Sequence, residues 1–131
     1  MSNKIDKILA EISAGELFDK ITILEIKKAK ISNKEKLVHI EKELSSLNET
    51  VKKFIPDQEN ILKYINDLKD INLKLWDIED GKRAAEKNKE FGKDFIELSR
   101  NVYKFNDKRA KIKLLINTTL GSNIKEVKSY E

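Results

Sequence analysis

Eight side chains in the second half of the chain are of types that bind ligands or partners. The set holds one tryptophan, one tyrosine, one asparagine, two arginines and three carboxylates, namely Trp76, Glu79, Asp80, Arg100, Tyr103, Asn106, Asp107 and Arg109. A guanidinium group grips phosphate or carboxylate through two parallel hydrogen bonds, and an indole ring stacks on other rings. Together these residues predict a site for a small anionic ligand or for a partner.

The same residues also have a structural interpretation. Trp76 on a mixed helix is typical of a core aromatic, and Glu79, Arg83 and Arg100 are typical of paired surface charges, which contribute little free energy. Both alternatives stay open at the level of sequence. In the ligand-site interpretation, Arg83 joins Arg109, because both guanidinium groups could grip a phosphate or carboxylate.

Metal binding and catalysis have weaker support. Asp77 and Asp80 lie three residues apart, but the acidic pair Glu41 and Glu43 is not at the helical spacing that would face them across a metal ion. His39 is the only histidine and cysteine is absent, so the chain offers no nucleophile–base pair and no thiolate ligand. We expect no catalytic residue, no metal and no cofactor.

Basic residues are concentrated near the end of the chain, at Lys104, Lys108, Arg109, Lys111 and Lys113, with Tyr103 and Phe105 interleaved. Helices that bind phosphate backbones have this pattern, and so do ordinary solvated helices. The net charge of +4, from 27 basic and 23 acidic residues, is small, and no phosphate-binding loop accompanies the basic run. Nucleic-acid binding is an alternative that we do not expect.

The elements that position these residues are all predicted to be helices. One proline and four glycines divide the chain, and apolar residues recur at helical spacing between them. The pattern predicts one all-α domain over residues 1–131, an antiparallel up-down four-helix arrangement of a short and a longer hairpin. We expect helices at about 14–31, 33–55, 57–89 and 94–120, and a tail at 122–131.

Local signals set the helix ends and the buried faces. Ser13 and Ser32 each precede a glutamate by three residues, the spacing of a capping box, and Gly121 is a C-terminal cap. Pro56 should end the second helix, with the third starting at once. The second helix should bury a stripe at Leu37, Ile40, Leu44, Leu47, Val51 and Phe54. The tail should lie against the helices or pair with residues 8–12 through Ile124, Val127 and Tyr130.

Helix lengths predict an uncovered surface. The first two helices span about 17 and 21 residues and the last two about 31 and 26, so the second hairpin should project about 10 to 15 Å beyond the first. With the turn near Phe91, Trp76 should lie level with Asn106, and Glu79 with Tyr103. One turn further from the tip, Arg109 should lie near Asn72 and Leu73. The eight candidate residues should then lie at the level where the first hairpin stops packing against the second.

The sequence predicts neither a signal peptide nor a membrane-spanning segment. Its first ten residues are interrupted by charges and lack the apolar core of a signal peptide, and no segment has the length of a membrane span. We therefore expect a cytoplasmic protein that does not enter a membrane.

Several blocks carry a resemblance to a known family. They lie at 15–24 (GELFDKITIL), 75–80 (LWDIED), 97–103 (ELSRNVY), 106–110, 116–117, 121–122 and 128–130. The chain resembles, over nearly its whole length, an uncharacterised family of short bacterial and viral proteins, a domain of unknown function. The resemblance adds Glu16, Asp19 and Lys20 to the polar residues of interest. Some members occur with sugar-transfer or surface-polysaccharide proteins, which implies an accessory role and no particular activity.

The leading hypothesis is a non-catalytic helical binding or assembly module. We expect a homodimer formed by the uncovered part of the second hairpin, because exposed long helices are self-complementary. One alternative is an enzyme or small-anion binder linked to nucleotide-sugar or glycan metabolism. The other is a weak nucleic-acid binder that uses the helix at 94–120.

Overall fold

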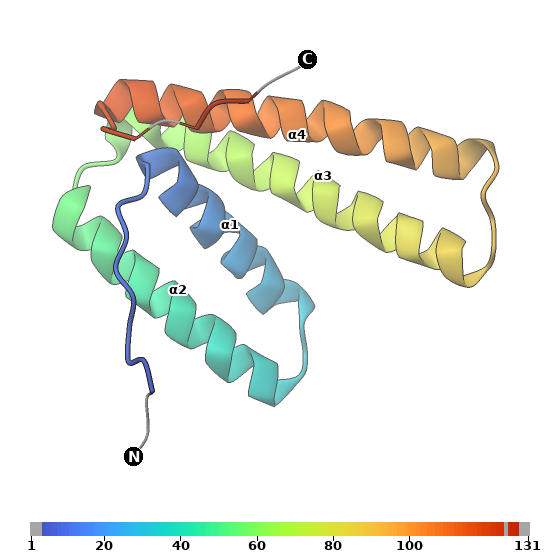
Figure 1. Ribbon diagram of the computed structural model, residues 1–131, viewed down its shortest axis with the longest axis horizontal. Helices are drawn as coiled ribbons and strands as arrows, with labels where there is room; N and C mark the ends of the chain where they lie inside the picture. The colour runs from blue at the N-terminus through green and yellow to red at the C-terminus, as the bar shows by residue number, and fades with distance from the viewer. Residues whose placement is uncertain (1–3, 125, 129–131) are drawn as a thin grey trace.

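The computed structural model describes residues 4–124 and 126–128, and this part of the chain contains four α-helices and no strand (Figure 1). The helices are α1 (Ala14–Lys30), α2 (Lys34–Phe54), α3 (Leu62–Lys87) and α4 (Lys93–Leu120), with a 3-10 turn at Glu59–Ile61 before α3. The predicted all-α four-helix arrangement is confirmed. No described helix is both long and apolar enough to cross a membrane.

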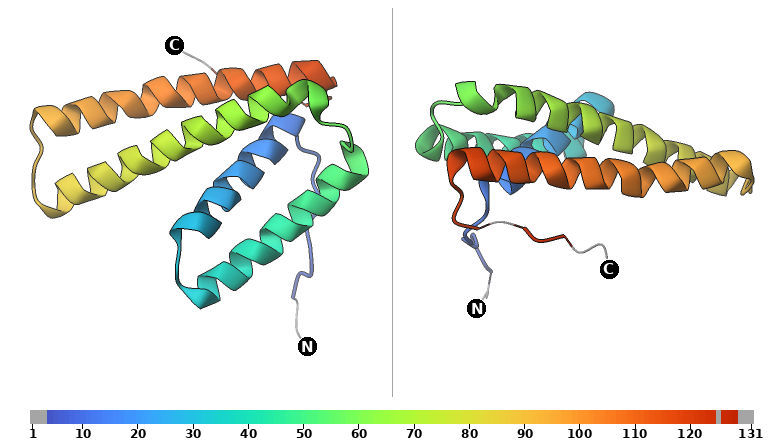
Figure 2. Two further views of the ribbon diagram at one scale, coloured as in Figure 1. Left: turned by 180° about the vertical axis from the view of Figure 1, so that it is seen from behind. Right: turned by 90° about the horizontal axis from the view of Figure 1, so that it is seen from above.

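The helices form two antiparallel hairpins of unequal length (Figure 1). α1 and α2 make the short hairpin, and α3 and α4 make the long one. The closed end of the long hairpin extends well beyond the short hairpin. The short hairpin crosses the long one obliquely, so α1 packs across the base of α3 and α4 and then diverges from α3 (Figures 1 and 2). This divergence leaves more of α3 uncovered than the difference in helix length alone would.

α1 is the central helix and contacts all three others. It can do so because it buries two stripes at helical spacing. The first stripe is apolar and belongs to the main hydrophobic cluster, at Leu17, Ile21 and Leu24. The second stripe is mostly small or polar and faces the long hairpin, at Gly15, Asp19, Thr22 and Ile26.

The hydrophobic core lies at the base, where all four helices meet. Ile61, Leu68 and Ile116 are completely buried there and pack in one cluster with α1 and α2. Phe54, predicted to be buried, is 69% exposed. The reason is that α2 has 21 residues against 17 in α1, so its last turn extends past the start of α1.

Two helix starts show how capping side chains select the boundary. α1 starts as predicted, with the Ser13 hydroxyl accepting from the Glu16 backbone N–H at 3.1 Å. The cap predicted at Ser32 is wrong by one residue, because Asn33 Oδ1 accepts from the Lys36 N–H at 3.1 Å. Asparagine caps a helix at least as well as serine, so the cap position is decided between two good candidates.

The third helix starts later than predicted. It begins at Leu62 and not near 57, because the residues after Pro56 form a turn in which Asp57 Oδ1 accepts from the Glu59 N–H at 3.0 Å. Such side-chain turns compete with helix formation. The end of α4 agrees with the prediction, since Gly121 has a φ of 67°, the left-handed conformation of a C-terminal cap.

The segment after α4 turns back along the helices (Figure 1). Asn123 Nδ2 donates to Glu11 Oε2 at 2.8 Å, and Lys128 forms an ion pair with α4. The tail was predicted to dock through apolar side chains, but Val127 is 95% exposed and the contacts are polar. Tyr130 lies outside the described residues.

Candidate ligand-binding cleft

A buried carboxylate, Asp19 of α1, is the centre of the polar contacts between the hairpins. Its side chain is 1% exposed. The Arg109 guanidinium of α4 donates to both of its oxygens, from Nε to Oδ1 at 2.9 Å and from Nη2 to Oδ2. Asn72 Nδ2 of α3 donates to the same Oδ1 at 2.9 Å. One side chain of α1 therefore ties together both helices of the long hairpin.

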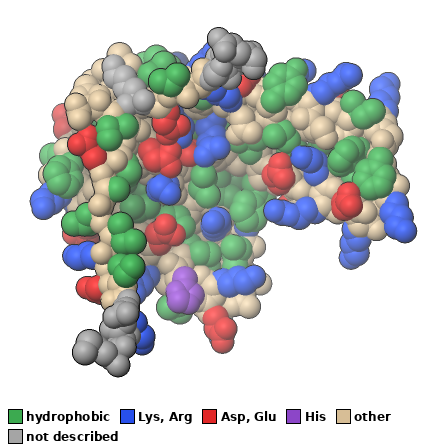
Figure 3. Space-filling model, viewed as in Figure 1, with side chains coloured by type: hydrophobic (Ala, Val, Ile, Leu, Met, Phe, Trp, Pro, Cys, Tyr) green, Lys and Arg blue, Asp and Glu red, His purple; other side chains and the backbone are tan. Residues whose placement is uncertain are grey.

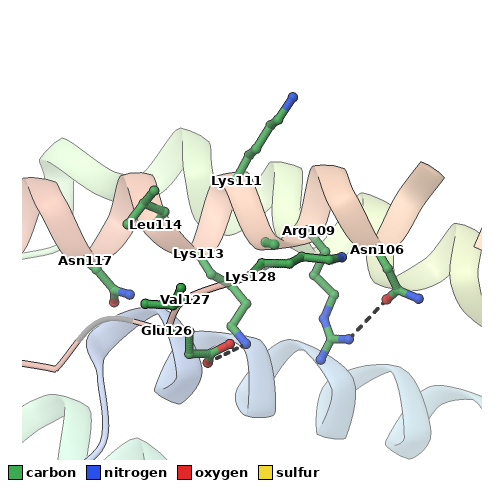
Figure 4. Close-up of a pocket in the computed structure, with 10 residues that line it drawn as sticks. Asn106, Arg109, Lys111, Lys113, Leu114, Asn117, Glu126, Val127 and Lys128 are labelled. Carbon is green, nitrogen blue, oxygen red and sulfur yellow. Dashed lines mark hydrogen bonds and ion pairs between the residues drawn. The ribbon is translucent and has the colours of Figure 1, made fainter. Parts of the chain in front are cut away.

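Lys113 adds a second cation to this buried cluster. Its Nζ lies 3.7 Å from Asp19 Oδ2 and donates to Glu16 Oε2 at 2.8 Å. It also pairs with Glu126 Oε1 of the tail at 2.8 Å, and Figure 4 shows Lys113 and Arg109 extending from α4 toward α1. The Lys113 side chain is only 9% exposed. These ion pairs therefore offset the free-energy cost of removing its ammonium group from water.

The ionisation of the cluster follows from these contacts. Burial alone would raise the pKa of Asp19, but hydrogen bonds from Arg109 and Asn72 and two nearby positive charges outweigh it and hold that pKa below its ordinary value. The hydrogen bond to Asp19 raises the pKa of Arg109. Burial would lower the pKa of Lys113, yet hydrogen bonds to two glutamates raise it. All three groups are charged at neutral pH and act as structural ties.

A glycine allows α1 to approach α4 closely enough for this cluster to form. The Gly15 N–H donates to Asn117 Oδ1 at 2.6 Å. A Cβ atom at position 15 would lie 2.5 Å from the Lys113 carbonyl oxygen, which is closer than such atoms approach. The neighbouring N–H of Ala14 donates to Ser122 Oγ at 3.0 Å. Free donors in the first turn of α1 are thus satisfied by the end of α4 and the residues after it.

Beside the cluster, α1, α3 and α4 enclose a cleft of about 480 Å³. It lies at the angle where the two hairpins diverge, and Figure 3 shows the surface of the molecule turning inward at this angle. Its apolar wall consists of Ile23, Ile26, Leu75 and Trp76. Its polar groups are Lys27, Asn72, Glu79, Arg83, Asn106 and Arg109.

Four of the eight residues singled out from the sequence line this cleft, namely Trp76, Glu79, Asn106 and Arg109. Trp76 of α3 and Asn106 of α4 were predicted to lie level with each other across the hairpin, and both line the cleft. The register is supported closer to the tip, where Gly81 packs against Leu98. Arg109 is shared between the cleft and the buried cluster, since two of its nitrogens bind Asp19.

The other four predicted site residues lie elsewhere. Asp80 is exposed and lies 3.6 Å from Arg83 in a surface pair. Arg100 and Tyr103 are exposed on α4. Asp107 pairs with Lys128 of the tail at 2.7 Å. The structure therefore does not bring these residues together with the cleft.

The register across the long hairpin placed Asn72 near Arg109, and both side chains donate to Asp19 Oδ1. Two other neighbours of Arg109 were not found from the residues alone, because Asp19 entered only through the family resemblance and Lys113 only as part of the basic pattern. A signal existed in the second stripe of α1, where residues 15, 19 and 22 recur at helical spacing but are not apolar. A polar stripe opposite an apolar one normally indicates solvent, and here it faces a second layer of helices.

The basic residues of α4 do not share one face. Arg109 and Lys113 extend toward α1, whereas Lys111 extends in the opposite direction (Figure 4). Lys108 lies over the ring of Phe105, 4.9 Å from its centroid. Two of the five cations counted in the basic pattern are thus neutralised inside the protein, which weakens the interpretation of α4 as a phosphate-binding helix.

The donor set of the cleft suits an organic ligand. Among the residues described by the structure, no three histidine, aspartate or glutamate side chains gather closely enough to hold a metal ion. Glu79 is the only carboxylate among the described residues that line the cleft. The other polar groups of the cleft are amides and cations, which bind acidic and hydroxyl groups.

Comparison with known proteins gives a family and nothing more specific. A family model described as a family of unknown function (DUF6165) matches residues 8–131. No curated protein and no solved structure matches the chain.

Proposed function

We propose that the chain, which belongs to DUF6165, a family of unknown function, is a non-catalytic binding module that holds a small ligand in the cleft between α1, α3 and α4. The observation that carries this proposal is the convergence of Trp76, Glu79, Asn106 and Arg109, from two helices, on one cavity. Beside the cleft, Asp19 and Lys113 are paired and serve the fold, whereas Arg109 belongs to both the buried cluster and the cleft.

The size and lining of the cavity support a small ligand. Binding sites for small molecules usually have volumes of about 300–1,000 Å³ and combine apolar walls with a few placed polar groups. The cleft has a volume of about 480 Å³ and this composition.

The residues present support binding without catalysis. Covalent catalysis needs a nucleophile beside a base. The residues that line the cleft include no serine, threonine, tyrosine or histidine, and the whole chain has no cysteine. Glu79 and Lys27 are of types that can act as nucleophiles, but the Glu79 carboxylate lies 3.9 Å from Lys82 in an ion pair and the described lining residues offer Lys27 no histidine base. His39 is exposed on α2, which does not line the cleft.

A fragment screen tests this function. Trp76 is the only tryptophan, so its indole N–H gives one resonance in a ¹H–¹⁵N spectrum of the full chain. We expect some members of a chemically diverse library to shift this resonance saturably and to raise the melting temperature. A library that leaves the resonance in place throughout would refute the proposal.

Assembly into a homodimer is the second candidate. Phe91, Ile96 and Tyr103 are 50%, 48% and 57% exposed on the part of the long hairpin that the short hairpin leaves uncovered. A two-fold interface between the long hairpins of two copies would cover these side chains. Sedimentation velocity over a range of concentrations tests it, with Tyr103→Lys expected to give a monomer; a wild-type chain that stays monomeric at high concentration would rule it out.

A further inference from the structure

The orientation of the Asn72 amide is fixed by its two neighbours. Its Nδ2 donates to Asp19 Oδ1 at 2.9 Å and to Thr22 Oγ1 at 3.0 Å. Thr22 Oγ1 must accept here, because its own proton goes to the Asp19 carbonyl oxygen at 2.9 Å. A carboxylate offers no proton either. The nitrogen of Asn72 therefore faces the cluster and its oxygen faces away.

This amide oxygen is an unused acceptor in the cleft. Asn72 is 6% exposed, and no described residue donates to its Oδ1. Every completely buried side-chain nitrogen or oxygen of the described residues has a partner, so the Asn72 oxygen must reach open space. The cleft is the open space that Asn72 lines. A ligand there meets an acceptor that requires an O–H or N–H group.

A fixed donor lies beside this acceptor. Arg109 and Asn72 donate to the same oxygen of Asp19, so the two side chains are neighbours. Asp19 occupies Nε and Nη2 of Arg109, whereas Nη1 has only a long contact of 3.4 Å to Asn106 Oδ1. The Nη1 edge is held in place by the buried carboxylate and is free to donate to an acidic oxygen.

The rest of the cleft extends the same pattern. Lys27 and Arg83 add positive charge, and the weak, exposed pair of Arg83 with Asp80 at 3.6 Å does not remove it. The one carboxylate among the described lining residues, Glu79, lies 3.9 Å from Lys82, which offsets its charge. Trp76 and Leu75 supply an apolar wall against which the C–H face of a ring can pack.

Building on the proposed function, we infer that the ligand is a small cyclic hydroxy acid: a ring that carries a carboxylate or phosphate for Arg109 and a hydroxyl for the Asn72 oxygen. The ring lies against Trp76. The acidic group is held on the side of Arg109, Lys27 and Arg83.

The test uses four probes that separate the two polar requirements. D-Glucuronate and D-glucose 6-phosphate carry both an acid and hydroxyls, D-glucose carries hydroxyls only, and cyclohexanecarboxylate carries an acid only. Each is titrated into the full chain while the Trp76 indole resonance is followed, with inorganic phosphate as a control for a free-ion site. At least one of the first two should bind at least about tenfold more tightly than D-glucose and cyclohexanecarboxylate, since an unmet buried polar group and an unmet charge both weaken binding.

Variants on the rim report the charge without touching the buried cluster. The double variant Lys27→Gln, Arg83→Gln should weaken the acidic probes about threefold or more, as expected for partly exposed charges. Lys111→Gln, on the opposite side of α4, is the matched control and should leave the affinity unchanged.

The other outcomes overturn the inference in distinguishable ways. If D-glucose or cyclohexanecarboxylate binds as well as the acidic sugars, or if inorganic phosphate alone gives the full shift, the hydroxy-acid assignment fails while the cleft remains a binding site. The same holds if unrelated fragments shift Trp76 and these probes do not. If no compound of any class shifts Trp76, the proposed function fails together with the inference.

Discussion

The Asp19 carboxylate can be removed with almost no change of shape by Asp19→Asn. This leaves Arg109 and Lys113 partly buried with one partner fewer, and breaking a buried ion pair costs about 3–5 kcal/mol. We expect a loss near the lower end, about 3 kcal/mol, because 29% of the Arg109 side chain remains exposed. Urea denaturation followed by circular dichroism measures it.

A surface pair on α3 provides the matched control. Asp80→Asn removes the partner of Arg83 in an exposed contact, and such pairs contribute about 0.2–1 kcal/mol at most. Equal effects of the two substitutions would contradict the role assigned to Asp19.

The pKa of Asp19 also predicts the pH dependence of stability. Its folded pKa is lowered, while the unfolded chain has an ordinary value of about 3.9. Below that value the unfolded state binds more protons than the folded state, so the free energy of unfolding decreases as the pH falls. The contribution is complete above about pH 4 and is lost as the pH falls through the folded pKa. Melting temperatures of the wild type and Asp19→Asn should therefore converge in acid, and parallel curves would contradict this.

At the residue scale, the sequence predicted which side chains lie close together better than it predicted their hydrogen-bond partners. The level of residues across the predicted hairpin placed Trp76, Asn106 and Arg109 close to one another, and all three line one cleft. The partner of Arg109 could not be chosen, because many carboxylates are available and the choice depends on which face of α1 meets the long hairpin.

Among the helices, α1 and α4 depend on a single small residue for their approach. Gly15→Ala places a methyl group against the Lys113 carbonyl oxygen and near Asn117 Oδ1. Backbone cannot yield as a flexible side chain does, so we expect a loss of about 2 kcal/mol or more from overpacking. Thermal and urea unfolding check the size of the effect.

Gly92 is the control for the general cost of replacing glycine. A Cβ atom there meets nothing within 4 Å, so Gly92→Ala should cost less than about 1 kcal/mol. If Gly15→Ala is as mild as Gly92→Ala, the close approach of α1 and α4 is not required.

The helices themselves were largely predictable. Lengths of 17 and 21 residues for α1 and α2 follow from capping residues and Pro56, which act within a few positions. The start of α3 was missed because Asp57 and Glu59 form a turn that competes with the helix. The oblique crossing of the hairpins could not be predicted, because it depends on side chains that meet across helices distant in the sequence.

For the whole molecule, stability should fall from the base of the long hairpin to its closed end. Leu68 and Ile116 are completely buried at the base, whereas the closed end is a two-helix segment that the short hairpin does not cover (Figure 1). Segments with few buried contacts open locally. Hydrogen exchange should therefore be faster over residues 84–101 than around Leu68 and Ile116, and uniform protection along α3 and α4 would contradict this.

The hydrogen bond between Asn123 and Glu11, at 2.8 Å, brings the two ends of the helical domain together. The segments before α1 and after α4 emerge on the same side of the molecule (Figure 2). Domains with adjacent ends tolerate circular permutation. A short linker joining these segments and a new opening in the turn between α3 and α4 would move the chain ends to the tip of the long hairpin. Fusion partners or surface tethers placed there would stand away from the cleft and leave its entrance free.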